Sequence, residues 1–468
     1  MHPPIPNPRI SAFILLRVRY GGRVGGIICA ILLILCLAGC RHSGEKTTGG
    51  VTTIEFWNGF TGPDGKTMEK IVRRFNDSHK DPDGSGQAIQ VRMQIIPWGT
   101  YYDKVTLSLA YGHRQAQSRA DGPDVFILHA DRLPEYADVN AVKPVDDLLK
   151  NGGLDPNDFA PRAWKAAQWK GRQCAIPLDC HPQALYYNTD LFKKAGIAKP
   201  PTNLSEFLAD AKKLTRDTNG DGKPDQWGFA FTWMRTNAHT FLAQFDSGWL
   251  TSDGRRSDLT SANAREAFQL MSDIIYKYKV CPPPEGEDAW IGFRTGKVAM
   301  AIEGIYMISS VEEQEGLNFA GAPCPVFGRH AGVWGNSHMM CMPRGISPEH
   351  RKAAWTFMKY LSDNSLEWAK GGQVPVRRSI LATPEFRKLR VQYEFSKELP
   401  YVVYSPPSTS LNQILPFCDA AVEAILNKIK PMDEALAEAA RRTNTVLERQ
   451  QGMDDGQGSM VNEEDGAE

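Results

Sequence analysis

The residues best suited to chemistry or ligand binding form a polar stretch, Asp179, His181 and Gln183, between two apolar runs. A carboxylate beside an imidazole can act as an acid–base pair, and both groups also pair with the hydroxyl groups of a ligand. Asp131 could supply a second carboxylate, and a glycoside hydrolase needs two of these roughly 5–10 Å apart. The sequence contains neither a G-x-S-x-G nor an HExxH motif, so serine-nucleophile and zinc-protease chemistry are not indicated.

A second group of polar residues has the spacing of a calcium-binding loop. Asp217, Asn219, Asp221 and Asp225 occupy the first, third, fifth and ninth positions of such a loop. The twelfth position, which normally carries a bidentate glutamate, is Gly228. Two interpretations therefore stay open, a calcium site and a turn rich in aspartate and glycine.

Prolines on either side of the first polar stretch predict how it is positioned. Pro177 and Pro182 hold the backbone extended and cannot donate hydrogen bonds to a neighbouring strand. Because this disfavours a hairpin, we predict that residues 178–183 carry the chain from one sheet to another, with a new strand at 184–187.

Strands alternate with helical patterns before this crossing. Residues 53–57, 89–95 and 125–128 have strand character, and apolar residues at helical spacing lie between the first two. This alternation predicts an α/β fold with a parallel sheet. Ligands bind beyond the carboxyl ends of such strands. The polar residues that follow the first and third strands are Asn58, His129, Asp131 and Arg132.

The length and charge of the chain limit the classes of function. A chain of 468 residues predicts two or three domains. Its 54 Lys and Arg residues balance its 54 Asp and Glu residues, so it lacks the basic patch expected of a nucleic-acid-binding protein.

The N-terminus has the pattern of a secretory signal. Several arginines precede an apolar run at residues 27–38, which is too short for a comfortable membrane span and ends in small residues before Cys40. The tetrapeptide at 37–40, LAGC, resembles a bacterial lipoprotein box, which implies a signal peptide at 1–39 and a lipid on Cys40. Residues 40–50 then form a flexible tether, and residues 451–468 a disordered acidic tail.

The cysteines beyond this signal indicate neither zinc nor redox chemistry, because they show no C-x-x-C pair and no metal-ligand spacing with histidine. A bond between Cys174 and Cys180 could brace the crossing in an oxidising compartment, and buried free thiols are the alternative.

Placed in order, these segments resemble the family 1 extracellular solute-binding proteins, the sugar-type receptors of bacterial ABC importers. The resemblance covers nearly all of residues 52–450 and rests on the order and spacing of several motifs. They are FWNGFTGPDG at 56–65, PDVFILHADRLPEYAD at 123–138, IPLDCHPQALYYNTDLFKKAGI at 176–197, GKVAMAIEGIYMI at 296–308 and AAWTFMKYLSDNSLEWAKGGQVPVRRSI at 353–380.

The resemblance implies a two-lobed periplasmic-binding-protein fold of type II, with ligand enclosed between the lobes. Three crossings join the lobes, near residues 178–183, 333–337 and 372–376. The first lobe would comprise residues 51–177 and 338–371, and the second lobe residues 184–332 and 377–450.

The resemblance also implies function and site. It implies a monomeric, lipid-anchored, extracytoplasmic binding protein, not an enzyme, that needs no cofactor and passes a sugar to a membrane permease and its ATPase. A sugar offers an apolar face to aromatic rings and hydroxyls to planar polar groups. The residues matched to ligand contacts are Trp57, Asn58, Asp131, Arg132, Asp179, His181, Tyr306, Trp334 and Asn336. Trp233 and Arg377 are two further candidates for ligand binding.

Other interpretations remain for these residues and for the ligand. Asp131 and Arg132 could cap a helix, the aromatic residues could belong to the core, and His181 could be a structural histidine. Leu128 stands where some maltodextrin binders have tryptophan, which argues against maltodextrin. Glycerol phosphate is an alternative solute, and a secreted glycoside hydrolase is an alternative class.

Overall fold

The computed structural model describes residues 50–80, 88–112, 122–284 and 288–464. The predicted signal peptide and most of the tether lie outside the described residues, as does the lipidation site at Cys40. Residues 51–468 form one compact unit by themselves. No helix in the described part of the chain is both long and apolar enough to cross a membrane.

The first of two main sheets has the strand order β2-β1-β3-β12-β6. Strands β1 (Thr52–Asn58), β2 (Ile89–Ile95) and β3 (Val125–His129) run parallel, as the sequence predicted. Strand β12 (His338–Cys341), from much later in the chain, pairs antiparallel with β3 and with β6 (Ile176–Pro177). The carboxyl end of β3 therefore lies beside the start of β12.

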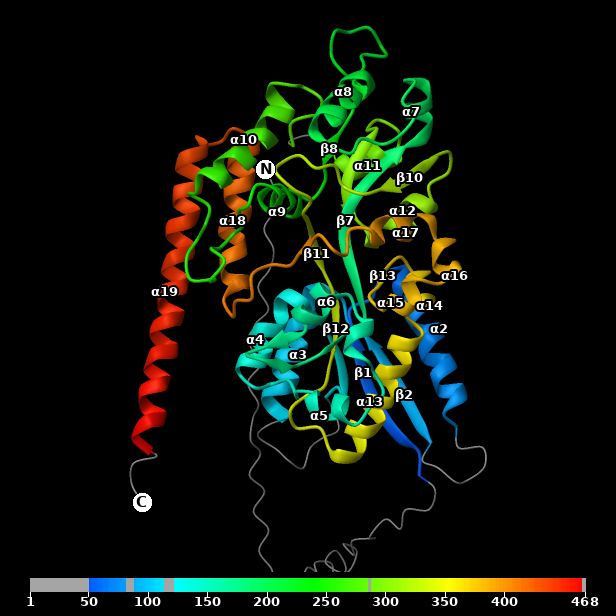
Figure 1. The fold of residues 1–468 in the computed structure, drawn as a ribbon, viewed down its shortest axis with the longest axis vertical. Helices are drawn as coiled ribbons and strands as arrows, with labels where there is room; N and C mark the ends of the chain where they lie inside the picture. The colour runs from blue at the N-terminus through cyan, green and yellow to red at the C-terminus, as the bar shows by residue number, and fades with distance from the viewer. Residues whose placement is uncertain (1–49, 81–87, 113–121, 285–287, 465–468) are drawn as a thin grey trace, which may run out of the picture. The chain divides into compact units, whose positions relative to one another are not determined.

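Helices cover this sheet through apolar faces at helical spacing. Helix α2 (Pro63–Ser78) buries Met68, Ile71, Val72 and Phe75 on one face, and a proline in its first turn is compatible with its start. The ring of Phe75 packs edge-on against Phe357 of helix α13 (Pro348–Asp363), with centroids 5.1 Å apart. Figure 1 shows α13 and α2 beside β1 and β2.

The second sheet is built around one long strand. Its order is β14-β11-β7-β9-β8, and β10 and β13 also pair with β7. The strands are β7 (Asp179–Asn188), β8 (Ala230–Phe231), β9 (Met300–Gly304), β10 (Phe319–Ala322), β11 (Val333–Asn336), β13 (Val374–Pro375) and β14 (Val402–Val403).

The chain passes between the two sheets where the sequence predicted a crossing. Only Leu178 separates β6 of the first sheet from β7 of the second. The strand expected at 184–187 already begins at Asp179, because β11 and β13 pair with the start of β7. Gly335 lies opposite Pro182, and Val374 lies opposite Cys180. The segments predicted as three crossings are thus neighbours.

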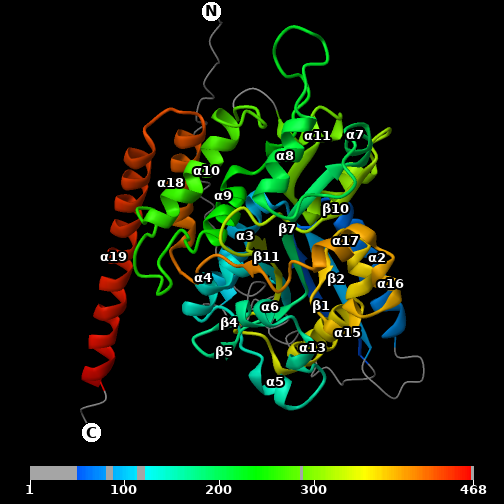
Figure 2. The same cartoon turned by 45° about the horizontal axis from the view of Figure 1, so that its top comes forward.

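Two long helices end the described chain and lie side by side in both views (Figures 1 and 2). Helix α18 spans Leu411–Leu426 and α19 spans Met432–Glu464. The sequence predicts a disordered acidic tail from Gln451 onward, and in the structure α19 continues as far as Glu464. No proline interrupts it, and propagation of an existing helix costs far less than nucleation.

The remaining elements have at most 15 residues each. They are α3 (Trp98–Gly112), η2 (Ala130–Arg132), α4 (Leu133–Asp138), α5 (Asp146–Lys150), η3 (Pro156–Asp158), α6 (Pro161–Ala166), β4 (Gln168–Trp169), β5 (Arg172–Gln173), α7 (Thr189–Lys194), α8 (Leu204–Leu214), α9 (Met234–Gln244), α10 (Ala262–Tyr276), α11 (Ala289–Arg294), η4 (Ile305–Met307), α12 (Ile308–Glu312), α14 (Ser365–Ala369), α15 (Arg378–Leu381), α16 (Pro384–Arg387) and α17 (Arg390–Ser396).

Candidate functional site

Three histidines meet where the two sheets join. His129 ends β3, His338 begins β12 directly opposite it, and His181 lies near the start of β7. The ring centroid of His338 lies 4.6 Å from that of His181 and 5.0 Å from that of His129. Strand register, rather than proximity in the sequence, brings the three side chains together.

Asp179 anchors this cluster from the first crossing. Its carboxylate accepts hydrogen bonds from the backbone N–H of His338 at 3.0 Å, from Nδ1 of His338 at 2.7 Å and from Nε1 of Trp368 at 2.6 Å. Burial alone would raise the pKa of Asp179, but the charge and hydrogen bonds of His338, together with the nearby His181, hold it well below its usual range. The fully buried carboxylate is therefore an ionised hydrogen-bond acceptor.

The other two histidines have different surroundings. The hydroxyl of Tyr102 lies 2.5 Å from Nδ1 of His129. Nδ1 of His181 lies 3.5 Å from Asp179 and has no hydrogen-bond partner. Burial lowers the pKa of both His129 and His181. The nearby Asp179 offsets part of this effect at His181, but the net direction is downward for both rings, so both imidazoles are neutral near pH 7.

Aromatic rings surround the cluster. Trp98 lies parallel to His338, with centroids 6.0 Å apart and an angle of 10° between the rings. Phe60 approaches His338 edge-on at 4.9 Å. Tyr306 and Trp334 lie 6.0 and 6.2 Å from His181. The junction thus combines apolar ring faces with polar groups.

Several buried polar atoms at the same strand ends lack a hydrogen-bond partner. They are Nδ2 of Asn58, Oδ1 of Asp131 and Nε of Arg132, beside Nδ1 of His181. A buried polar atom without a partner costs about 1–3 kcal/mol. Such atoms call for an explanation, and a bound ligand or ordered water is the usual one.

The structure gives three more of the predicted residues specific neighbours. Trp57 is a core residue, only 4% exposed, with Nζ of Lys104 4.9 Å from its ring centre. Asn336 accepts a hydrogen bond from the backbone N–H of Ala130 at 2.9 Å and so ties β11 to η2. The guanidinium group of Arg132 lies over the ring of Tyr102 at 4.3 Å.

The structure does not join two predicted residues to the histidines through any contact among the described residues. Arg377 forms ion pairs with Asp158 at 2.5 Å and Asp363 at 3.0 Å. Trp233 is 56% exposed and lines a separate surface cavity of about 520 Å³ with Pro282, Trp290 and other residues. No motif of the sequence assigned either residue to the ligand.

The loop with calcium spacing is built as a turn. Asp217 accepts hydrogen bonds from the backbone N–H groups of Gly220 at 2.6 Å and Gly222 at 2.8 Å. Asp225 accepts from the backbone N–H of Thr218 at 2.9 Å. The side-chain oxygen of Asn219 accepts from the backbone N–H of Asp221, and the carboxylate of Asp221 accepts from the backbone N–H of Lys223. The polar side chains of this exposed loop thus bind the backbone of the loop itself.

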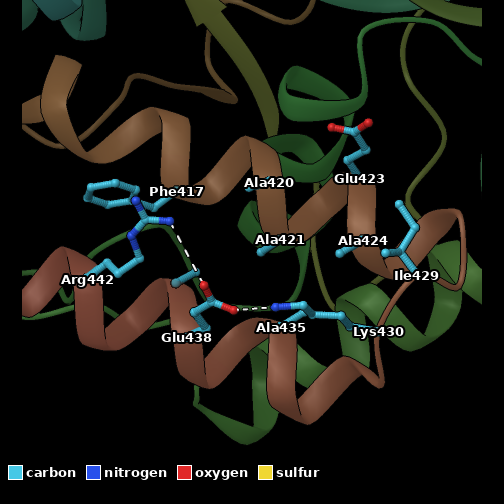
Figure 3. Close-up of a pocket in the computed structure, with 11 residues that line it drawn as sticks. Phe417, Ala420, Ala421, Glu423, Ala424, Ile429, Lys430, Ala435, Glu438 and Arg442 are labelled. Carbon is cyan, nitrogen blue, oxygen red and sulfur yellow. Dashed lines mark hydrogen bonds and ion pairs between the residues drawn. The ribbon is translucent and has the colours of Figure 1, made fainter.

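A cavity of about 300 Å³ lies between α18 and α19 (Figure 3). Five of its eleven lining residues are alanine, and three of its charged residues, Lys430, Glu438 and Arg442, contact one another. Glu438 binds Nζ of Lys430 at 2.6 Å and lies 4.0 Å from Arg442, which stacks on Phe417 at 4.2 Å. It therefore lacks the unpartnered polar atoms that mark the junction of the sheets.

Sequence reasoning missed part of the junction. The sequence predicts His129 as a strand-end residue but does not assign it to the site, and it gives no prediction for His338, Trp98, Tyr102 or Trp368. The polar residue at a strand end was the available signal for His129. No local spacing pointed to the others.

Comparison with known proteins gives the context. The chain is 25% identical over 325 residues to the maltotriose-binding protein of Pyrococcus abyssi, covering 67% of each chain. It is 23% identical over 435 residues to the sn-glycerol-3-phosphate-binding periplasmic protein of Yersinia pestis, covering 85% of this chain and 93% of that one.

Solved structures share its fold. The sugar-binding protein MalE from Xanthomonas citri aligns with a TM-score of 0.73 at 20% identity, over 86% of this chain and 99% of that one. An ABC substrate-binding protein of Listeria monocytogenes, solved with cycloalternan, aligns with a TM-score of 0.69 at 20% identity, over 85% and 99%. These likenesses confirm the two-lobed α/β fold. The family model for bacterial extracellular solute-binding proteins matches residues 60–366, and the chain therefore belongs to that family.

Proposed function

We propose that this solute-binding protein captures a sugar or oligosaccharide at the junction of its two sheets and delivers it to an ABC importer. The observation that carries the proposal is the set of buried, unpartnered polar atoms on Asn58, Asp131 and Arg132 at the strand ends of a junction where the rings of Trp334 and Tyr306 lie near His181. Hydroxyl groups can donate to the free carboxylate oxygen and accept from the free N–H groups. An aromatic ring then complements the apolar face of a sugar.

Capture proceeds by closure in this proposal. Asn58, Asp131 and Arg132 follow strands of the first sheet, whereas Tyr306 and Trp334 belong to segments of the second. A ligand that contacts both groups binds the closed arrangement better than the open one, and this difference in affinity shifts the equilibrium towards closure. The permease then recognises the closed protein.

The same proposal keeps the protein monomeric and anchored by a lipid on Cys40. The support is the LAGC tetrapeptide behind a basic and apolar leader. Replacing Cys40 with Ser should release the protein from the membrane fraction into the soluble fraction of cells. Retention of the variant in the membrane fraction would contradict the anchor without affecting the proposed ligand.

The charges at the junction favour a neutral ligand over a phosphate. Arg132, the arginine at the strand ends of the junction, pairs with Glu135 at 3.2 Å, and Arg377 pairs with Asp158 and Asp363 away from the histidines. Hydrolysis is disfavoured as well, because the carboxylate of Asp179 is fully buried and bound by His338 and Trp368. It is therefore not placed as the second carboxylate of a glycosidase.

A thermal-shift screen of sugars, with glycerol 3-phosphate included, tests the proposal. A ligand present at 100 times its Kd should stabilise the native protein by about 2.7 kcal/mol. Asp131→Ala should abolish the shift produced by a sugar hit. Asp103→Ala, the same substitution at an exposed position of α3, should leave it unchanged.

The outcomes separate the alternatives. A shift with glycerol 3-phosphate and with no sugar would replace the sugar by a phosphate ligand. Turnover of an oligosaccharide would overturn the binding function in favour of hydrolysis. A sugar that stabilises the wild type and Asp131→Ala equally would remove Asp131 from the site.

A further inference from the structure

We propose that His129, His181 and His338 form a binding site for a divalent transition metal of the zinc class. Among the described residues, they are the group of at least three metal-ligating side chains whose ligand atoms all lie within 4.8 Å of one another. The inference does not rest on the proposed sugar, because it concerns the affinity of the protein for the metal alone.

The distances are close to those that a metal requires. Zinc binds imidazole nitrogen at about 2.0–2.1 Å, which puts neighbouring ligand nitrogens of a tetrahedron about 3.4 Å apart. The three ligand atoms therefore need only a small inward movement from their separation of at most 4.8 Å. Each comes from a different strand, β3, β7 or β12, so the backbone fixes the direction of approach.

The hydrogen bonds around the cluster match those of histidine ligands. In metal sites, the ring nitrogen that does not bind the metal usually contacts a carboxylate, carbonyl or water. Nδ1 of His338 contacts Oδ2 of Asp179 at 2.7 Å, and Nδ1 of His129 contacts the hydroxyl of Tyr102 at 2.5 Å. These contacts leave Nε2 of both rings available for the metal.

The third histidine supplies the independent sign of a missing ligand. His181 is 4% exposed, and its Nδ1 has no hydrogen-bond partner. Such an atom is costly when nothing binds it, and a metal coordinated by Nδ1 itself would supply the missing partner.

The chemistry of the ligands selects the metal. Imidazole suits Zn²⁺, Cu²⁺ and Ni²⁺, whereas Ca²⁺ and Mg²⁺ prefer oxygen ligands. The carboxylate of Asp179 lies beside the cluster and is hydrogen-bonded to Nδ1 of His338 at 2.7 Å. Three protein ligands leave a fourth position for water or for an oxygen atom of a solute.

Calorimetric titration of the full-length, tag-free, chelator-treated protein with ZnCl₂ tests the site. We expect one ion per chain and no binding of Mg²⁺. His129→Gln removes a ligand from the partly exposed edge of the cluster and should weaken zinc binding more than about 100-fold, since loss of an outer hydrogen bond alone costs 10–100-fold. His350→Gln, which alters a partly exposed histidine paired with Asp124 at 2.9 Å, should bind zinc as the wild type does.

Tyr102→Phe tests the positioning hydrogen bond. It removes only the hydroxyl on Nδ1 of His129 and should weaken binding about 10-fold. The absorption spectrum of the Co²⁺ form should change in intensity or position as well, which a purely structural role for Tyr102 would not produce.

The Co²⁺ spectrum of the wild type requires no substitution and therefore tests the site even where a variant fails to fold. Strong visible absorption of a four-coordinate Co²⁺ ion, displaced by one equivalent of Zn²⁺, supports the proposal. Octahedral Co²⁺ absorption, absence of zinc binding, or equal zinc affinity in wild type and folded His129→Gln would overturn it. None of these results depends on whether a sugar binds.

Discussion

Nδ1 of His338 donates a hydrogen bond to Asp179 across 2.7 Å, although 159 residues separate them in the sequence. The bond joins the start of β7 in the second sheet to the start of β12 in the first sheet. A second donor, Nε1 of Trp368, reaches the same carboxylate oxygen from α14 at 2.6 Å. Asp179 is therefore the common anchor of three segments that are distant in the sequence.

Asp179→Asn should destabilise the protein by about 2–4 kcal/mol, because hydrogen bonds to a charged group contribute about 1.5–3 kcal/mol each and an amide presents N–H groups to donors. Urea denaturation measures this loss. Asp138→Asn is the matched control, since Asp138 also accepts from an indole, Nε1 of Trp169 at 3.0 Å, but is partly exposed. It should cost less than about 1 kcal/mol. Equal losses in the two variants would contradict the anchoring role of Asp179.

Gly59→Ala should damage both packing and ligand binding. A Cβ atom at Gly59 would lie 2.2 Å from the Trp98 ring, so the ring must move away from His338. Overpacking of this kind costs about 1–3 kcal/mol, and we expect at least a ten-fold loss of ligand affinity.

Gly99→Ala is the control for this prediction. It lies next to Trp98 in the sequence, and no heavy atom lies within 4 Å of its added Cβ. It should keep the affinity and stabilise helix α3 by up to about 1 kcal/mol. Unchanged ligand affinity in Gly59→Ala would show that the position of Trp98 is unimportant for binding.

Glu398 should make the stability of the protein depend on pH. Burial raises its pKa to about 7 from the ordinary 4.5. Between these values the native protein holds a proton that the unfolded chain has released. The contribution to stability is therefore fully present below pH 4.5, falls by about 1.4 kcal/mol per pH unit as the pH rises, and is lost above pH 7.

Glu398→Gln should remove this dependence, because the amide oxygen can still accept from the backbone N–H of Cys324 and does not titrate. Urea denaturation between pH 4.5 and 8 should show that the free energy of unfolding of the variant increases relative to that of the wild type as the pH rises. Glu385→Gln, at an exposed glutamate, should differ from the wild type by a constant amount. A constant difference for Glu398→Gln would contradict the raised pKa.

The sequence predicted the strand-end residues of the junction because their position follows from local patterns. Asn58, Asp131 and Arg132 come directly after apolar runs, and the prolines beside Asp179 and His181 marked a crossing. These rules use only a few neighbouring residues each, so one sequence suffices for them.

The partners of these residues required the register of distant strands. His338 meets His129 because β12 inserts between β3 and β6, and Trp368 reaches Asp179 from 189 residues away. Nothing in the local sequence fixes such pairing. The same limit applies to His129, His181 and His338. They lie far apart in the sequence, and their spacing matches no metal-binding motif.

The cysteines provide the last prediction. All six in the described residues, Cys174, Cys180, Cys281, Cys324, Cys341 and Cys418, are buried free thiols. The hydroxyl of Tyr404 donates a hydrogen bond to Sγ of Cys180 at 3.6 Å, and burial raises the pKa of the Cys180 thiol to about 12. Because thiolate is the reactive form, native protein should resist alkylation at these positions.

Alkylation after denaturation without a reductant, followed by peptide mass spectrometry, should modify all six. A pair that reacts only after reduction, above all Cys174 with Cys180, would instead identify a disulfide that stiffens the crossing, and reduction should then change ligand affinity.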